Sequence, residues 1–211
     1  MLINGREIGG WTKLDLNVIL QRIYEKGKEQ SLQIIGIDGC GGAGKSTIAD
    51  KIKSKFSTVT VVHMDDFYLP SAQIVNEHPT NKSIGADFDW KRLLQEVLDP
   101  ISNGVEGCYK RYDWETDSLA ESHNVPANGI VIIEGVYATR QELAEVYDLK
   151  IWVNCPRETR IKRGIARDGE AARDMWENNW MVAEDMYVES HKPHKLADFI
   201  IDGTNHEITN K

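Results

Sequence analysis

Short apolar runs alternate along the chain with longer segments in which apolar residues recur every three or four positions. Because the runs are rich in β-branched residues and only a few residues long, they predict strands. Runs that are apolar on both faces and alternate with helices are typical of a parallel sheet covered on both sides, so we expect an α/β fold with five parallel strands. The predicted strands are Leu32–Asp38, Val59–Met64, Ile130–Glu134, Leu149–Asn154 and Phe199–Asp202.

The segments between these runs predict helices. Helical spacing of apolar residues marks Leu14–Ile23, Lys45–Phe56 and a segment that Asp89 caps at its N-terminus. Thr139-Arg-Gln-Glu142 fits a capping box that opens a short helix, and Pro156 suits the first position of another. We expect one domain over residues 1–211, with residues 1–30 as an N-terminal helical extension.

Composition narrows the function classes. The chain has 211 residues, 41% of them apolar, and a net charge of −8, which disfavours a dedicated binder of nucleic acid. No signal-peptide pattern and no apolar run near the ~20 residues of a membrane span appears in the sequence. Its 3 cysteines are irregularly spaced without a CxxC pair. We therefore expect a cytoplasmic protein with reduced thiols and neither nucleic-acid nor membrane partners. A homo-oligomer remains open.

A glycine-rich stretch directly follows the first predicted strand and precedes a predicted helix. It fits the phosphate-binding pattern G-x-x-x-x-G-K-[ST]. In this pattern the loop N–H groups and the helix N-terminus hold phosphates, Lys45 reaches the β- and γ-phosphates, and the Ser46 hydroxyl ligates Mg²⁺. The flanking strand and helix favour this interpretation over a simple glycine-rich turn. The predicted nucleotide-binding residues are Gly39, Cys40, Gly41, Gly42, Ala43, Gly44, Lys45, Ser46 and Thr47.

Two adjacent carboxylates, Asp65 and Asp66, follow the second predicted strand. Ligands of parallel α/β sheets bind at the carboxyl ends of the strands, so these acids should lie beside the phosphate-binding loop. Phosphoryl transfer to an alcohol needs a group that orients the hydroxyl and accepts its proton, usually an Asp. The alternative is a pair of acids that caps a helix or faces solvent. We expect Asp65 to be the base and Asp66 to point elsewhere.

An arginine-rich helix is predicted after the fourth strand. Arg157, Arg160, Arg163 and Arg167 fall within about 120° of arc on a helix. Such a face could close over ATP as a lid, at about residues 157–173, and neutralise charge on the transferred phosphoryl group. The alternative is a solvated face paired with neighbouring acids. We expect Arg160, Arg163 and Arg167 to be the catalytic members.

The acceptor side offers fewer signals. Asp87 follows a polar loop, and its carboxylate could hold two acceptor hydroxyls. Trp176, Trp180 and Tyr187 recur at helical spacing, which favours core packing over a base-stacking platform.

Several of these segments together resemble the uridine kinase/phosphoribulokinase family of P-loop kinases. The order and spacing match from about Gln33 to Gly203. The resemblance implies a nucleoside-monophosphate-kinase-like three-layer α/β/α fold, ATP and Mg²⁺ as cofactors, and phosphorylation of a primary alcohol on a small molecule. It is carried by Gly39–Ser46, Asp65–Tyr68, Tyr112-Asp113, Ile133-Glu134-Gly135, Thr159-Arg160 and Lys195–Asp198.

The resemblance also implies residue roles. Asp65 matches the family's catalytic acid–base, Tyr68 and Tyr112 match positions that line the acceptor pocket, and Glu134 matches a position that orders Mg²⁺ through water.

One departure concerns the acceptor. Pyrimidine nucleoside kinases of this family usually carry a His shortly after the Tyr-Asp pair, whereas this chain continues Trp114-Glu-Thr-Asp117, and His123 comes later. A nucleoside such as uridine or cytidine is the expected acceptor. Nicotinamide riboside, pantothenate, glycerate, sugars, and a catalytically decayed ATP-binding module remain alternatives, although intact Asp65, Lys45 and Ser46 argue against the last.

Overall fold

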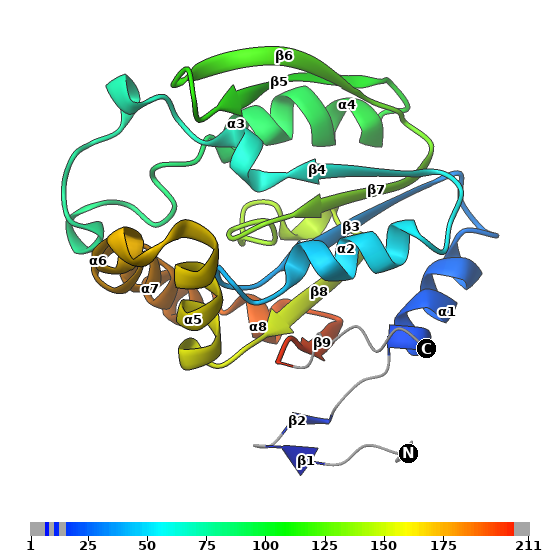
Figure 1. Cartoon of the computed structure of the whole chain (residues 1–211). Helices are drawn as coiled ribbons and strands as arrows, with labels where there is room; N and C mark the ends of the chain where they lie inside the picture. The colour runs from blue at the N-terminus through cyan, green and yellow to red at the C-terminus, as the bar shows by residue number, and fades with distance from the viewer. Residues whose placement is uncertain (1–6, 9–10, 13–15, 205–211) are drawn as a thin grey trace.

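The computed structural model describes residues 7–8, 11–12 and 16–204, and its centre is a five-stranded parallel sheet (Figure 1). The strand order is β4-β7-β3-β8-β9, so the strand that leads into the glycine-rich loop lies in the middle. The predicted α/β class and five parallel strands are confirmed. The bounds are β3 Leu32–Asp38, β4 Val59–His63, β7 Gly129–Glu134, β8 Leu149–Asn154 and β9 Phe199–Asp202.

Helices cover both faces of this sheet. On one face, α1 (Leu16–Lys26) and α2 (Lys45–Lys53) pack on isoleucines of the central strands. On the other face, the helical segment α3 (Trp90–Leu93), η4 (Leu94–Leu98) and α4 (Asp99–Ser102) covers the β4/β7 side. There α7 (Met181–His191) packs near Trp152 of β8, and α8 (Pro193–Leu196) follows it. Each fully buried Ile or Leu contributes about 1.5–3 kcal/mol to folding, so the two faces hold the sheet firmly.

Two further pairs of strands were not predicted. An antiparallel hairpin of β5 (Gly107–Asp113) and β6 (Ser118–Val125) lies over the β4 side of the molecule (Figure 1). The residues of β6 are largely polar and mostly exposed, so this strand lacks the apolar run that marks the strands of the central sheet. Near the N-terminus, β1 (Glu7–Ile8) pairs with β2 (Trp11–Thr12), so among the described residues of the expected extension the helical part is α1. Leu14, in the first predicted helix, lies outside the described residues.

The predicted capping box at Thr139 is wrong. The Thr139 N–H and hydroxyl both donate to Asp38 Oδ2, at 2.8 and 3.0 Å, and Glu142 pairs with Arg140. The segment therefore forms turns, followed only by the short 3-10 helix η5 (Ala144–Val146).

Several element ends also differ: α1 extends to Lys26 and β7 begins at Gly129. α2 ends at Lys53, β4 ends at His63, and Pro156 caps α5 (Arg157–Asp168) instead of opening it. Asp89 caps α3 as predicted, since its carboxylate accepts the Arg92 N–H at 3.0 Å. Within the described part of the chain, no helix has the length and apolar character needed to cross a membrane.

Candidate active site

A cavity of about 640 Å³ opens at the carboxyl ends of β3, β4 and β7. Its wall is shared by the glycine-rich loop, the 3-10 helix η1 (Met64–Phe67), the 79–88 loop, α5 and residues 176–186. The cavity thus lies where a parallel sheet places its ligands. The predicted site residues that line it are Gly41, Gly42, Gly44, Lys45, Ser46, Thr47, Asp65, Tyr68, Asp87, Glu134, Arg163 and Arg167; Gly39, Cys40, Ala43, Tyr112 and Arg160 do not.

The glycine-rich loop adopts a compact turn before α2. Gly42 and Gly44 have φ of +74° and +100°, in the region that favours glycine. A Cβ on Gly42 would also come within 2.6 Å of the Arg160 carbonyl oxygen. Lys45 begins α2, is buried, and donates from Nζ to the Cys40 carbonyl at 3.2 Å. The loop N–H groups, the helix N-terminus and this ammonium therefore lie together, as phosphate binding requires.

Cys40 contributes its backbone to the loop and keeps its side chain buried. Burial raises the pKa of its thiol to about 12, so the thiol stays protonated at neutral pH. The structure thus gives Cys40 no place in the cavity wall.

Asp38, the last residue of β3, anchors the start of the loop. It is fully buried and accepts four hydrogen bonds: two from Thr139, one from the Gly39 N–H at 2.6 Å and one from the Tyr187 hydroxyl at 2.7 Å. Burial raises its pKa, although these donors oppose the rise. In the sequence, this role is marked by nothing more than a polar residue at the end of an apolar run.

Glu134 joins two neighbouring strand ends to the loop. Its Oε1 accepts the Ser46 hydroxyl at 3.1 Å and lies 2.6 Å from His63 Nδ1. Burial would raise the pKa of Glu134, but the His63 hydrogen bond and the Lys45 charge outweigh burial and lower it. The same hydrogen bond raises the pKa of His63, a residue that we did not predict in the site.

These groups fit a magnesium ion that is held mainly by nucleotide phosphates. Mg²⁺ in such sites takes one or two protein oxygens and keeps several waters, and the Ser46 hydroxyl and the Glu134 carboxylate supply oxygens side by side. No group of three or more His, Cys, Asp or Glu side chains able to hold a metal occurs among the residues that the structure describes.

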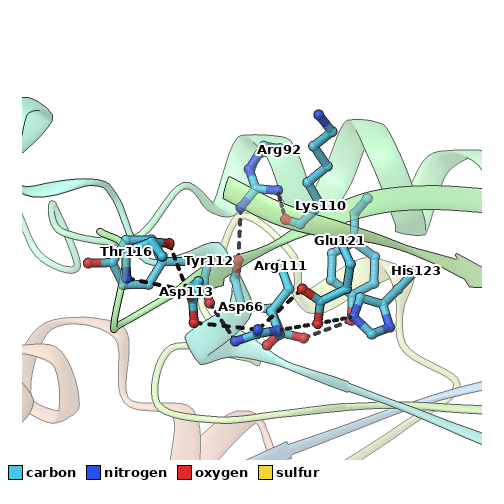
Figure 2. Close-up of polar contacts among 10 residues, drawn as sticks. Asp66, Arg92, Lys110, Arg111, Tyr112, Asp113, Thr116, Glu121 and His123 are labelled. Atoms are coloured by element: carbon cyan, nitrogen blue, oxygen red, sulfur yellow. Dashed lines mark hydrogen bonds and ion pairs between the residues drawn. The ribbon is translucent and has the colours of Figure 1, made fainter. Parts of the chain in front are cut away.

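The adjacent acids Asp65 and Asp66 point in different directions. Asp65 is open to the cavity, whereas Asp66 Oδ2 accepts the Tyr109 hydroxyl at 2.7 Å on the hairpin side. Figure 2 shows Arg92 bridging the backbone carbonyls of Asp66 and Lys110, at 2.9 and 2.7 Å. Asp66 thus attaches η1 to the hairpin, and Asp65 is left facing the phosphate-binding loop.

The pKa of Asp65 is raised above its ordinary 3.8. Enclosure by the cavity walls is the main cause, and the charge of Glu134 adds to it, while Lys45 opposes the rise. A carboxylate with a raised pKa is a stronger base than an ordinary Asp, which suits proton acceptance.

Aromatic rings form the acceptor end of the cavity. Tyr68 packs against Phe88 at 5.1 Å, Trp114 at 4.6 Å and Tyr112 at 5.5 Å between ring centroids. Tyr68, Phe88 and Trp114 line the cavity, and Trp114 is 57% exposed. Tyr112 is buried behind them. Trp114 replaces Tyr112 as the hairpin residue at the wall, and its exposure on a turn was not evident from the sequence.

Polar groups of the acceptor end are already paired with one another. The Lys82 ammonium lies 2.8 and 2.9 Å from the two oxygens of Asp87, and both residues line the cavity. At the tip of the hairpin, Asp117 accepts the Tyr112 hydroxyl at 2.7 Å and the Ser71 N–H at 2.8 Å. His123 lies within the hairpin, stacked on Tyr109, and is not part of the cavity wall.

The arginines of α5 divide into two kinds. Arg163 and Arg167 line the cavity; Arg163 Nη1 also donates to the carbonyls of Gly42 at 3.1 Å and Gly203 at 2.8 Å. Arg157 forms a surface ion pair with Asp185 at 2.6 Å. That partnership agrees with the solvated-face alternative for this one residue.

Arg160 is buried away from the main cavity. It pairs with Glu184 at 2.8 Å, and it lines a separate cavity of about 420 Å³ between the end of β8 and α7. The structure therefore does not bring Arg160 together with the other two arginines. Glu184 was not predicted, because its partners lie far away in the sequence.

The three aromatic residues at helical spacing also divide. Trp176 and Tyr187 are buried, as the core interpretation predicted, whereas Trp180 is 38% exposed. Both tryptophans line the cavity.

The sheet, the loop and the surrounding cavity define a P-loop kinase fold. The family model of the phosphoribulokinase/uridine kinase family matches residues 34–201, and the chain belongs to this family. The uridine kinase of Clostridium novyi is 31% identical over 179 residues, which cover 80% of this chain and 86% of that protein.

Two solved structures extend the comparison of the fold. A structure described as a possible uridine kinase from Bacillus stearothermophilus has a TM-score of 0.69 at 24% identity, covering 89% of this chain and 97% of that one. A D-glycerate 3-kinase from Cryptococcus neoformans has a TM-score of 0.54 at 12% identity, with 92% and 89% covered. The expected family and fold are thus confirmed, and the protein is a small-molecule kinase of this family.

Proposed function

We propose that the protein transfers the γ-phosphate of ATP to a hydroxyl of a nucleoside, such as uridine or cytidine. One observation carries the proposal: a single cavity joins the phosphate-binding loop to the Asp65 carboxylate and to an aromatic wall. A kinase needs both substrates in one enclosure, with a proton acceptor between them. Uridine kinases among the relatives support the nucleoside.

The loop end binds the nucleotide. Phosphates are held by the N–H groups of Gly42 and Gly44 and by the Lys45 ammonium, and Arg167 reaches the same space from α5. Ser46 and Glu134 hold Mg²⁺, Glu134 through water; when bound, the ion neutralises charge on the transferred phosphoryl group. Arg163, fixed beside Gly203, forms part of the wall on this side. Residues 157–173 are the proposed lid.

Asp65 acts on the acceptor. Its carboxylate orients the acceptor hydroxyl and takes its proton as the oxygen attacks phosphorus. The charges of Lys45 and Glu134 act on the pKa of Asp65 in opposite directions: Lys45 lowers it and Glu134 raises it. Asp66, bound to Tyr109, is not available for this step.

The aromatic wall favours a flat acceptor. Tyr68, Phe88 and Trp114 offer ring faces and edges to a base, and stacking on such rings is worth about 1–3 kcal/mol per base. Asp87 is the proposed partner for sugar hydroxyls. Tyr112, beneath the wall, supports Tyr68 rather than touching the acceptor directly.

A second candidate acceptor is an alcohol that carries a carboxylate, such as glycerate or pantothenate. The ammonium of Lys82 lines the acceptor end, and the hairpin offers no His at the tip for base recognition. An acceptor carboxylate would compete with Asp87 for this ammonium.

The test measures ADP production with ATP and Mg²⁺ against a panel of acceptors: uridine, cytidine, nicotinamide riboside, glycerate, pantothenate and sugars. We expect turnover with a pyrimidine nucleoside and little without acceptor. Turnover confined to the carboxylated alcohols would favour the second candidate. ATP binding without any acceptor-dependent ADP release would indicate a decayed binding module.

We also propose a cytoplasmic location. The three cysteines are free thiols, and Cys108 is exposed, which suits a reducing compartment.

A further inference from the structure

The phosphate-binding loop is held from one side by helix α7. Glu184 reaches from α7 to the loop, and its Oε1 accepts the Gly41 N–H at 2.7 Å. The other oxygen, Oε2, accepts Arg160 Nη1 at 2.8 Å. The Arg160 and Glu184 side chains are only 7% and 6% exposed. One buried carboxylate therefore joins the loop, α5 and α7, which lie far apart in the sequence.

The Gly41 N–H is already bonded to Glu184, and the loop is closely packed at this residue. A Cβ on Gly41 would lie 2.8 Å from Glu184 Oε1 and 3.0 Å from the Trp176 ring. Other atoms of the same ring pack on Gly164 of α5, where a Cβ would overlap them. The Gly41 N–H thus serves to hold the loop, while Gly42, Gly44 and Lys45 after it line the cavity.

A second link from the same helix fixes the first residue of the loop. Tyr187, about one turn beyond Glu184, donates its hydroxyl to Asp38 Oδ2 at 2.7 Å. Asp38 Oδ1 accepts the Gly39 N–H at 2.6 Å. Helix α7 therefore holds Gly41 directly, through its own Glu184. It holds Gly39 indirectly, because Tyr187 bonds to Asp38 and Asp38 accepts the Gly39 N–H.

We propose that Glu184, oriented by Arg160, is a positioning residue that sets the path of the phosphate-binding loop for ATP. The inference rests on the proposed function, because it takes ATP as the nucleotide. N–H groups that are already in place need no rearrangement when a charged ligand arrives, so a fixed loop binds phosphate more tightly. Burial raises the pKa of Glu184, and the charge of Arg160 opposes that rise. Arg160 also orients the carboxylate, since an unpaired charge in this enclosure is costly.

The experiment measures the Kd of a non-hydrolysable ATP analogue with Mg²⁺ by calorimetry. In Glu184→Gln, Arg160 attracts the single amide oxygen, so the Gly41 N–H faces an NH₂ group and loses its acceptor. We expect the Kd to rise about tenfold, the cost of one buried unsatisfied donor. Adding Arg160→Met frees the amide oxygen for Gly41, so the double variant should bind more tightly than Glu184→Gln alone.

The matched control is Asp185→Asn. Asp185 is the next residue of α7, its side chain is 60% exposed, and its partner Arg157 lies at the surface. Removing this ion pair should leave the Kd unchanged. Melting temperatures of all variants without nucleotide separate loss of fold from loss of binding.

The outcomes distinguish a positioning role of Glu184 from a purely structural one. An unchanged Kd in Glu184→Gln with a lower melting temperature would overturn the inference, because it indicates a purely structural pair. Tighter binding would also overturn it and indicate that the carboxylate competes with phosphate. Failure of the wild type to bind the analogue would refute the proposed function instead. Amide exchange at Gly41 in the nucleotide-free wild type needs no variant: we expect slow exchange, and fast exchange would overturn the inference.

Discussion

The phosphate end of the cavity and its acceptor end are built from different kinds of structure. The phosphate end sits on the ends of central strands, and its supports Asp38, Lys45 and Glu184 are at most 9% exposed. The acceptor end is built from the 79–88 loop and the tip of the hairpin, where Trp114 is 57% exposed. The sheet fixes the chemistry shared by a family, while loops carry what can vary.

The charge pairs of the two ends differ in the same way. The Arg160–Glu184 pair is buried, so removal of one partner leaves a costly unpaired charge, about 3–5 kcal/mol. The pairs of the hairpin are partly exposed, such as Arg111–Glu121 at 2.7 Å (Figure 2). Exposed pairs contribute only about 0–1 kcal/mol. Changes at the phosphate end should therefore be severe, and changes at the acceptor end should be selective.

The largest effect is expected from Lys45→Ala. The variant removes the charge that contacts the transferred phosphoryl group, so kcat/KM should fall by several orders of magnitude. Without nucleotide, the melting temperature should change little, because Nζ makes a single hydrogen bond, to Cys40. Lys53→Ala, at an exposed position of the same helix, is the control and should be fully active. Near-normal turnover of Lys45→Ala would refute the phosphate-binding role.

Asp65→Asn should have the next largest effect. Loss of a positioned base lowers kcat by roughly 10²–10⁴-fold. ATP affinity should stay nearly unchanged, since the loop holds the nucleotide. Asp66→Asn is the matched control: it weakens the bond to Tyr109 and should lower stability more than kcat. If Asp66→Asn were the crippling change, the base would be the other acid; if both were mild, Asp87 would be the next candidate.

The sequence predicts the phosphate end well, for physical reasons. Strands buried on both faces, such as Leu32–Asp38, are continuous apolar runs, and the loop pattern is local in sequence. The supports of the loop could not be predicted this way. Glu184 meets Gly41 across 143 positions of the chain, and Thr139 meets Asp38 across 101. That long-range partner is why Thr139 does not cap a helix.

The acceptor end is less predictable because its elements are polar and its contacts depend on loops. Strand β6 is mostly exposed and shows no apolar run. Trp114 stands on the hairpin turn, where no periodicity applies. The roles of Tyr68, Tyr112 and Asp87 therefore remain predictions for experiment.

A smaller and more selective effect is expected from Trp114→Ala. Loss of one stacking ring should raise the KM of a nucleoside acceptor by about tenfold and leave the KM of ATP unchanged. Leu119→Ala is the control, because Leu119 is a 41% exposed residue of the same hairpin and does not line the cavity. An acceptor KM that Trp114→Ala does not change would favour a non-aromatic acceptor.

The acidic limb of the pH profile of kcat/KM should lie modestly above the pH expected for an ordinary Asp. Asp65 accepts a proton only as the carboxylate, and its pKa is raised above 3.8, mainly by enclosure in the cavity. Activity should therefore fall, as the pH is lowered, at a pH above that of an ordinary Asp. The charge of His63 lowers the pKa of Asp65, so in His63→Asn this acidic limb should move to higher pH. If the acidic limb disappeared in His63→Asn, the titrating group would be His63 and not Asp65.

The smallest effect concerns how much of the lid moves. The part of α5 up to Gly164 is tied to the phosphate end by Arg160 and by Arg163, which donates to the Gly42 carbonyl. The last turn of α5 carries Arg167, whose side chain is 70% exposed. The helix is capped by Gly169, whose φ is +88° and beside which a Cβ would meet nothing.

Hydrogen exchange with and without a non-hydrolysable ATP analogue measures this difference. We expect residues 157–164 to be protected even without nucleotide, because Gly164 packs directly on Trp176 and does not loosen the helix there. Protection gained on binding should be confined to about residues 167–175, where few buried contacts hold the backbone. Added protection along the whole of α5 would instead make the complete helix the lid. Unchanged exchange throughout would return Arg167 to a solvated surface role.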